Sequence, residues 1–191
     1  IYQTGTIWGS AWQPNNKKTF SPSFLKRHSG LGPLGMGGVY VMDYSGAVGG
    51  YETGFDLQGV SPANGGAILD FGTVNRTGVN NALNNDNTSD SYDIDAFGKI
   101  GKVGYGDAEI GPDGNTLWMV NLQQRALITV DVTDPSAYPG LVNQYPLTGF
   151  ANLPTCTNGV LRPWGLSFYE DKGYLGCVCT AENGGTAADM E

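Results

Sequence analysis

The residues with the clearest capacity for chemistry are four aspartates in one polar stretch: Asp86, Asp90, Asp93 and Asp95. Neighbouring asparagines add side-chain carbonyl oxygens, and Ca²⁺ binds six to eight oxygens of these kinds. The stretch departs from the EF-hand pattern, because it has no glycine at the sixth position and no glutamate at the twelfth. It therefore predicts either a Ca²⁺ site at these four aspartates or a solvated surface loop.

His28 is the one histidine of the chain and follows two basic residues, Lys26 and Arg27. A Ser-His-Asp system would have to use this imidazole. The sequence has no Gly-x-Ser-x-Gly elbow to supply the nucleophile. We therefore predict no catalytic residues and assign the basic triplet to a solvated rim or to pairing with carboxylates.

Three cysteines carry the remaining reactive side chains. Cys177 and Cys179 lie two apart on an expected strand and face the same side, which is poor geometry for a mutual disulfide. Cys156 lies in the preceding loop and can reach either one. We expect a Cys156–Cys179 disulfide with Cys177 as a buried free thiol; three reduced, packed cysteines are the alternative.

The overall charge excludes several classes of partner. The formal net charge is −8 and 15 % of residues are charged, so the basic stripe that neutralises nucleic-acid phosphates is missing. No apolar run is long enough to span a bilayer, so we expect no membrane insertion. Low charge with abundant Asn, Gly, Thr and Ser is typical of extracellular β proteins.

The elements that must position these residues repeat along the chain. Residues 8–13, 107–111 and 164–169 each read as an apolar strand, followed by a polar turn and a second strand. The turn Pro112-Asp113-Gly114 is the sharpest of the three, and residues 125–131 add a third strand after it. With 30 Gly and 10 Pro and no helical periodicity, the pattern predicts an all-β fold.

Repetition of such hairpins is the signature of a β-propeller. We expect a single partial β-propeller domain over residues 1–191, built of four-stranded antiparallel blades. The blade units lie near 5–60, near 61–150 with an Asn/Asp-rich insertion at 75–95, and at 151–191, where the blade is incomplete. The chain then represents about three to four blades, truncated at both ends, as a piece of something longer.

Two acids lie on an expected innermost strand, Asp107 and Glu109. A catalytic metal at a propeller axis needs acids from several blades, and residues 8–10 and 164–166 offer none at the equivalent places. We therefore assign these acids to packing and turn hydrogen bonds. The four tryptophans recur on expected strands and either seal blade-to-blade packing or form a platform for carbohydrate.

Several segments resemble a family of bacterial cell-surface β-propeller proteins associated with Sdr-type B repeats. The matching segments spread over most of the chain: residues 7–12, 24–35, 38–43, 103–107, 112–122 and 162–166. In that family the stretch resembling residues 179–182 is followed by further strands of the same blade. The resemblance implies export, a cell-surface location and a large multidomain parent protein, and it carries no known activity.

These observations lead us to expect a non-enzymatic extracellular module with a structural or adhesive role in a surface protein or filament. A Ca²⁺-dependent hydrolase or lyase and a carbohydrate-binding propeller are the alternatives. The expected partners are other parts of the parent chain, or partner subunits, that cover the open blade edges, and possible glycan ligands; no nucleic-acid partner is expected.

Overall fold

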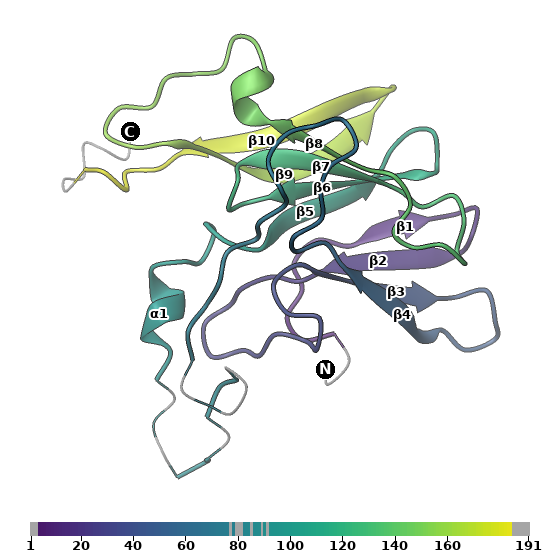
Figure 1. Cartoon of the computed structure of the whole chain (residues 1–191), viewed down its shortest axis with the longest axis horizontal. Coiled ribbons are helices and arrows are strands. Elements are labelled where there is room, and N and C mark those ends of the chain that lie inside the picture. Colours follow the sequence, from purple (N-terminus) through teal and green to yellow (C-terminus); the bar gives the residue numbers. More distant parts are fainter. Residues whose placement is uncertain are drawn as a thin grey trace.

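The computed structural model describes residues 4–76, 78, 82–84, 86–88, 90 and 92–184 as an all-β arrangement of three antiparallel sheets (Figure 1). The first sheet contains β1 (Ala11–Gln13), β2 (Lys18–Pro22), β3 (Gly38–Asp43) and β4 (Gly50–Asp56), in that order. The second contains β5 (Tyr105–Ile110), β6 (Thr116–Asn121), β7 (Ala126–Asp131) and β8 (Val142–Pro146). The third is the hairpin of β9 (Leu161–Tyr169) and β10 (Lys172–Cys179). The one short α-helix of the described residues is α1 (Ile94–Phe97), and η2 (Leu147–Gly149) is a 3₁₀ turn.

The three hairpins expected from the sequence are present as β1–β2, β5–β6 and β9–β10. Local chemistry explains the turn between β5 and β6. Gly114 has a positive φ of 73°, and the Asp113 carboxylate accepts the backbone N–H groups of Asn115 and Thr116. This Asx turn holds the chain reversal through contacts that are local in the sequence.

Aspartates also terminate several strands in the same way. The Asp43 carboxylate accepts the N–H of Ser45 at 2.7 Å, and the Asp131 carboxylate accepts the N–H of Thr133 at 2.9 Å. These side chains satisfy backbone groups where the ladder ends. Part of the acidity of the chain therefore serves turn formation.

The sheets stack, so that the second sheet is covered on both faces. One face, with Leu117, Met119 and Ile128, packs against Phe20 and Val41 of the first sheet. The opposite face, with Val120 and Leu127, packs against Leu166 of the hairpin. Burying side chains of this size stabilises the fold by about 1.5–3 kcal/mol each, which makes these two interfaces the main source of cohesion.

The connections between strands differ in length. The turns at 44–49 and 170–171 are short and lie at the right in Figure 1. The connections at 23–37 and 57–104 are long, and the first of them extends to the left in that view. Part of the second connection covers the outer edge of the second sheet. Asn64 donates to the carbonyl of Gln144 in β8 at 2.9 Å and accepts its N–H at 3.1 Å. An edge strand that would otherwise offer free backbone groups is thereby blocked.

Candidate functional site

The polar stretch predicted to bind Ca²⁺ contains a buried ion pair. Asp93 accepts two hydrogen bonds from the Arg76 guanidinium, at 3.0 and 2.9 Å, and one from the backbone N–H of His28. The side chains of Arg76 and Asp93 are 2 % and 0 % exposed. Burial opposes the charge of Asp93, but these hydrogen bonds outweigh it and lower the pKa. Arg76 also donates to the carbonyls of Ser29 and Lys26, so the pair fastens the 26–29 turn to the insertion.

The other three aspartates do not converge on Asp93. Asp95 pairs with Lys99 at 2.8 Å and accepts the N–H of Asn75, and both contacts lower its pKa. Asp86 accepts the N–H and hydroxyl of Thr88 in a local turn, and Asp90 is exposed. Within the described residues no three His, Cys, Asp or Glu side chains group around one point. The Ca²⁺ site stays a prediction, and two of its four carboxylates have cationic partners.

Asp107, one of the two acids on β5, connects neighbouring sheets. Asp107 accepts the N–H of Leu166 in the hairpin at 3.0 Å and the N–H of Ala108 at 3.0 Å. One carboxylate thus connects β5 to β9. Burial raises the pKa of Glu109, and the nearby Asp107 adds to that shift. The contacts of Asp107 match the packing and hydrogen-bonding role assigned to it from the sequence.

Glycines allow the first strands of successive sheets to approach closely. A Cβ on Gly9, just before β1, would lie 2.6 Å from the amide nitrogen of Ala108 in β5. A Cβ on Gly106 in β5 would lie 2.8 Å from the carbonyl oxygen of Trp164 in β9. Both distances are shorter than a side chain tolerates, so each sheet needs a glycine where the next one meets it.

The four tryptophans divide into two pairs. Trp118 and Trp164 border the core between the second sheet and the hairpin, as the packing interpretation expected. Trp8 is 60 % exposed, although it contacts Trp164 edge-on with ring centroids 5.7 Å apart. Trp12 is 46 % exposed and contacts Tyr44. The second pair is therefore open to contacts beyond the described fold.

A hollow that sequence reasoning missed lies on the hairpin-facing side of the second sheet, over the part of that face that the hairpin does not reach. It has a volume of about 500 Å³, within the range of ligand pockets. Trp118, Thr129 and Asn143 stand side by side across β6, β7 and β8 and form its floor. Tyr145 stacks on Trp118 with ring centroids 6.1 Å apart and planes 19° apart, and Asp131 borders the hollow. Their juxtaposition depends on strand register, which the sequence does not display.

A second hollow, of about 640 Å³, lies between the glycine-rich segment 30–37 and residues 72–76. Its wall is mostly glycine and aliphatic residues, together with Asp56, Gln58 and Arg76. The Arg76 guanidinium is committed to Asp93 and to two backbone carbonyls. The site offers few polar groups to a ligand.

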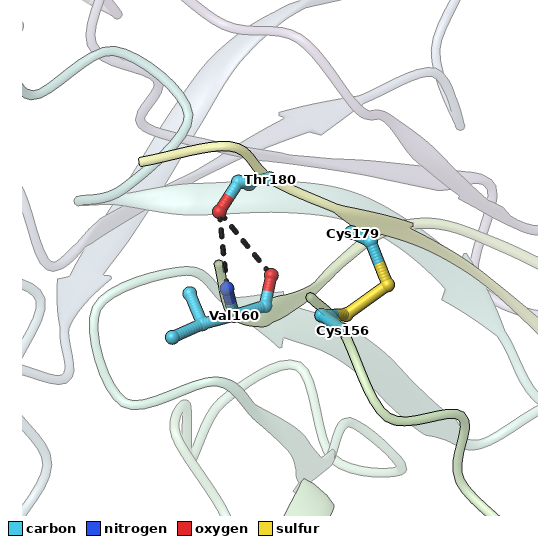
Figure 2. Close-up of a disulfide and its surroundings, with 4 residues drawn as sticks. All are labelled: Cys156, Val160, Cys179 and Thr180. Carbon is cyan, nitrogen blue, oxygen red and sulfur yellow. Dashed lines mark hydrogen bonds between the residues drawn. A yellow bond between two sulfur atoms is a disulfide. The ribbon is translucent and has the colours of Figure 1, made fainter. Parts of the chain in front are cut away.

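A disulfide joins the segment that precedes β9 to the last residue of β10, as Figure 2 shows. Cys156 and Cys179 form a disulfide, the pairing expected from the sequence. Beside it, the Thr180 hydroxyl contacts the backbone of Val160, and the Thr180 N–H donates to the Val160 carbonyl at 3.0 Å. Cys177 is a free thiol but is exposed, so the expectation of a buried thiol was wrong.

The comparisons with known proteins place few limits on identity. No family model matches the chain, and no solved structure matches it. Colossin-D of Dictyostelium discoideum is similar, with 23 % identity over 192 residues. The match covers 96 % of this chain and 17 % of Colossin-D, so the chain spans a small part of that protein. The resemblance to bacterial surface propellers is not tested by these findings and stays a prediction.

Among the described residues, no helix has the length and apolar character needed to cross a bilayer.

Proposed function

We propose that this chain is a non-enzymatic extracellular module with a structural or adhesive role, in which the three sheets are successive blades of a partial β-propeller. The observation that supports the proposal concerns the inner strands of the proposed blades, β1, β5 and β9, whose residues at the contacts serve packing between sheets. Enzymatic propellers gather catalytic acids there, whereas this chain places Gly9 and Gly106 at the contacts and uses Asp107 to bind the backbone of Leu166. The inner strands serve cohesion between sheets.

The disulfide supports a location outside the cell. Cys156 and Cys179 are joined, and such bonds persist in oxidising compartments. The long connections between strands then provide the surface for contacts, because loops on a rigid scaffold are the usual carriers of binding.

Adhesion is tested by coating beads with the oxidised chain and measuring their retention on surfaces of immobilised matrix proteins, glycans and whole cells. We expect retention above that of albumin-coated beads. Replacement of residues 30–35 by a Gly/Ser segment of equal length should reduce it, whereas the same treatment of residues 45–48, in a short turn, should not. Retention no greater than albumin on every surface would reject an adhesive role.

A second candidate function, carbohydrate binding, is favoured by the hollow on the second sheet. Sugars stack their apolar faces on aromatic rings and direct hydroxyls to amides, hydroxyls and carboxylates. Trp118 and Tyr145 provide the rings, and Thr129, Asn143 and Asp131 provide the polar groups.

A glycan array followed by titration calorimetry tests this candidate. Tyr145→Ala and Asn143→Ala should each weaken binding at least tenfold, because both side chains line the hollow. Trp12→Ala is the matched control, since Trp12 is an exposed aromatic on another sheet. Equal binding by all three variants and the original chain would place the sugar elsewhere.

A further inference from the structure

The hollow on the second sheet contains polar groups that have no partner within the described chain. Thr129, in the floor of the hollow, is 5 % exposed, and its hydroxyl makes no hydrogen bond to any described residue. The indole N–H of Trp118, which lies beside Thr129 on β6, makes none either. Buried polar groups in proteins are normally hydrogen-bonded. A ligand that pairs with these groups would therefore gain binding free energy.

Asp131 adds an unused acceptor to the same hollow. Its Oδ1 atom accepts the backbone N–H and the hydroxyl of Thr133, at 2.9 and 2.6 Å, whereas no described residue donates to its Oδ2 atom. The hydrogen bonds from Thr133 lower the pKa of Asp131, and the nearby charge of Asp113 acts in the opposite direction. Asp131 is therefore ionised at neutral pH and has one oxygen free to accept a hydrogen bond.

The charged groups around the hollow are all negative. Asp113 and Asp131 line it, and none of the described residues that line it is basic. Neither carboxylate forms an ion pair with a described residue. An acidic sugar would bring a further negative charge to these two carboxylates, and like charges placed together across an interface weaken binding.

The groups without partners also define which uncharged chemistry fits. The indole N–H of Trp118 needs an acceptor, Oδ2 of Asp131 needs a donor, and the hydroxyl of Thr129 accepts either. An ammonium group only donates and a carboxylate only accepts, whereas a sugar hydroxyl does both. The Trp118 ring contacts Tyr145 and Phe168, with ring centroids 6.1 and 5.7 Å apart. These contacts hold the ring in place before a ligand binds, which lowers the cost of binding.

We propose that the hollow binds an uncharged, hydroxyl-rich sugar and rejects acidic sugars, with Oδ2 of Asp131 accepting a hydroxyl of the ligand. This inference rests on the carbohydrate-binding function proposed above. It adds to that function the charge of the ligand and the residue that selects for it. The adhesive role of the chain does not depend on it.

Titration calorimetry with matched pairs of oligosaccharides tests the proposal. Each pair consists of a homo-oligomer of glucose, galactose or mannose and the oligomer of the corresponding uronic acid, equal in length and linkage. We expect the neutral member of at least one pair to bind at neutral pH, and its acidic counterpart to bind about tenfold more weakly or worse. In 1 M salt, where charges are screened beyond about 3 Å, this difference should shrink.

Asp131→Asn tests the role of the free oxygen. The variant keeps a side-chain oxygen for the N–H of Thr133, but it replaces Oδ2 by an amide that donates and removes one negative charge. The neutral sugar should bind about fivefold more weakly, and the preference over the acidic sugar should fall. Asp134→Asn is the matched control, because Asp134 accepts the N–H and hydroxyl of Ser136 in the same way but does not line the hollow. It should change neither quantity.

The outcomes separate this inference from the functions on which it builds. Acidic sugars that bind as tightly as their neutral counterparts, or equal behaviour of Asp131→Asn and Asp134→Asn, would overturn the inference and keep carbohydrate binding. If no sugar binds, in calorimetry or on the glycan array, both the inference and the carbohydrate candidate are rejected. Bead retention is read separately, because the adhesive role is proposed for the long connections and not for the hollow.

Discussion

At the scale of single residues, most of the groups that suggest chemistry are engaged in holding the chain together. Asp93 binds Arg76 and the backbone of His28, Asp107 binds the backbone of Leu166, and Asp113 fixes a turn. Charge-assisted hydrogen bonds to carboxylates are stronger than hydrogen bonds between neutral groups. Many of the acidic residues therefore serve hydrogen bonds and ion pairs within the fold.

The buried pair gives the sharpest prediction at this scale. Asp93→Asn should destabilise the fold by about 3–5 kcal/mol, because it leaves the Arg76 guanidinium buried without its counter-charge. Urea denaturation measures the loss. The double variant Arg76→Met/Asp93→Leu should recover much of it, since removing both charges removes the desolvation cost. Equal stability of Asp93→Asn and the original chain would mean that the pair is not buried in solution.

A second cluster of charged residues should make the stability of the fold sensitive to acid. Lys18 is buried and pairs with Asp43 at 3.0 Å and Glu52 at 2.7 Å. Hydrogen bonds from Ser45, and then from Lys18, lower the pKa of Asp43 to about 2. A lowered carboxyl pKa contributes stability that is complete above the ordinary value near 4 and disappears as the pH falls through 2. The melting temperature, followed by circular dichroism, should therefore fall between pH 4 and pH 2. The melting temperature of Asp43→Asn should be lower than that of the original chain at pH 4, and it should fall less between pH 4 and pH 2.

Calcium removal tests the one predicted metal site. If Asp86 and its neighbours bind Ca²⁺, EGTA should lower the melting temperature at constant ionic strength, because an ion that binds the folded state stabilises it. A melting temperature that does not respond to EGTA or to added Ca²⁺ would reject the predicted Ca²⁺ site.

At the scale of elements, the hairpins could be predicted because their signals are local. Pro112-Asp113-Gly114 specifies a reversal, and alternation specifies the flanking strands. The Arg76–Asp93 pair was not predictable, because its burial depends on the carbonyls of a turn about fifty residues earlier. The hollow was missed for a related reason, since Trp118, Thr129 and Asn143 become neighbours only through the registers of three strands. The exposure of Cys177 was not predictable either, because it depends on what packs against β10 in the folded chain.

The disulfide should determine the stability of the hairpin. Cys156 and Cys179 are 23 residues apart, and a loop of that size is stabilised by roughly 3 kcal/mol. Cys156→Ser/Cys179→Ser should lose about that much in urea denaturation, whereas Cys177→Ser should be close to neutral because Cys177 is exposed. Titration with a thiol reagent before unfolding should find one reactive group per chain. Three reactive groups in the oxidised, folded protein would contradict the pairing.

At the scale of the whole molecule, close approach between sheets is the feature that organises the stack. The first strands of the three sheets, β1, β5 and β9, lie in sequence across the stack, and two glycines make their contacts possible. The order of the sheets along the chain is also their order in space.

Gly9→Ala tests this organisation. The added methyl would meet the backbone of Ala108 at 2.6 Å, and we expect a loss of about 1–3 kcal/mol, typical of overpacking. Gly149→Ala, where no neighbour is within 4 Å, should change little. The two variants are compared by thermal melting of dilute protein, and equal melting temperatures would show that the sheets are less closely apposed than described.

The amide of Asn64, which blocks the outer edge of β8, also bears on how the protein ages. Asn64 is followed by Gly65, which has a positive φ of 77°, and asparagine before glycine is the pair most prone to spontaneous deamidation. Conversion of that amide to a carboxylate would remove the donor to the Gln144 carbonyl. Two hydrogen-bond acceptors, the new carboxylate and that carbonyl, would then lie next to each other. Stored protein should then gain both a negative charge and an unprotected strand edge, so its tendency to form intermolecular sheet should rise with time and alkalinity.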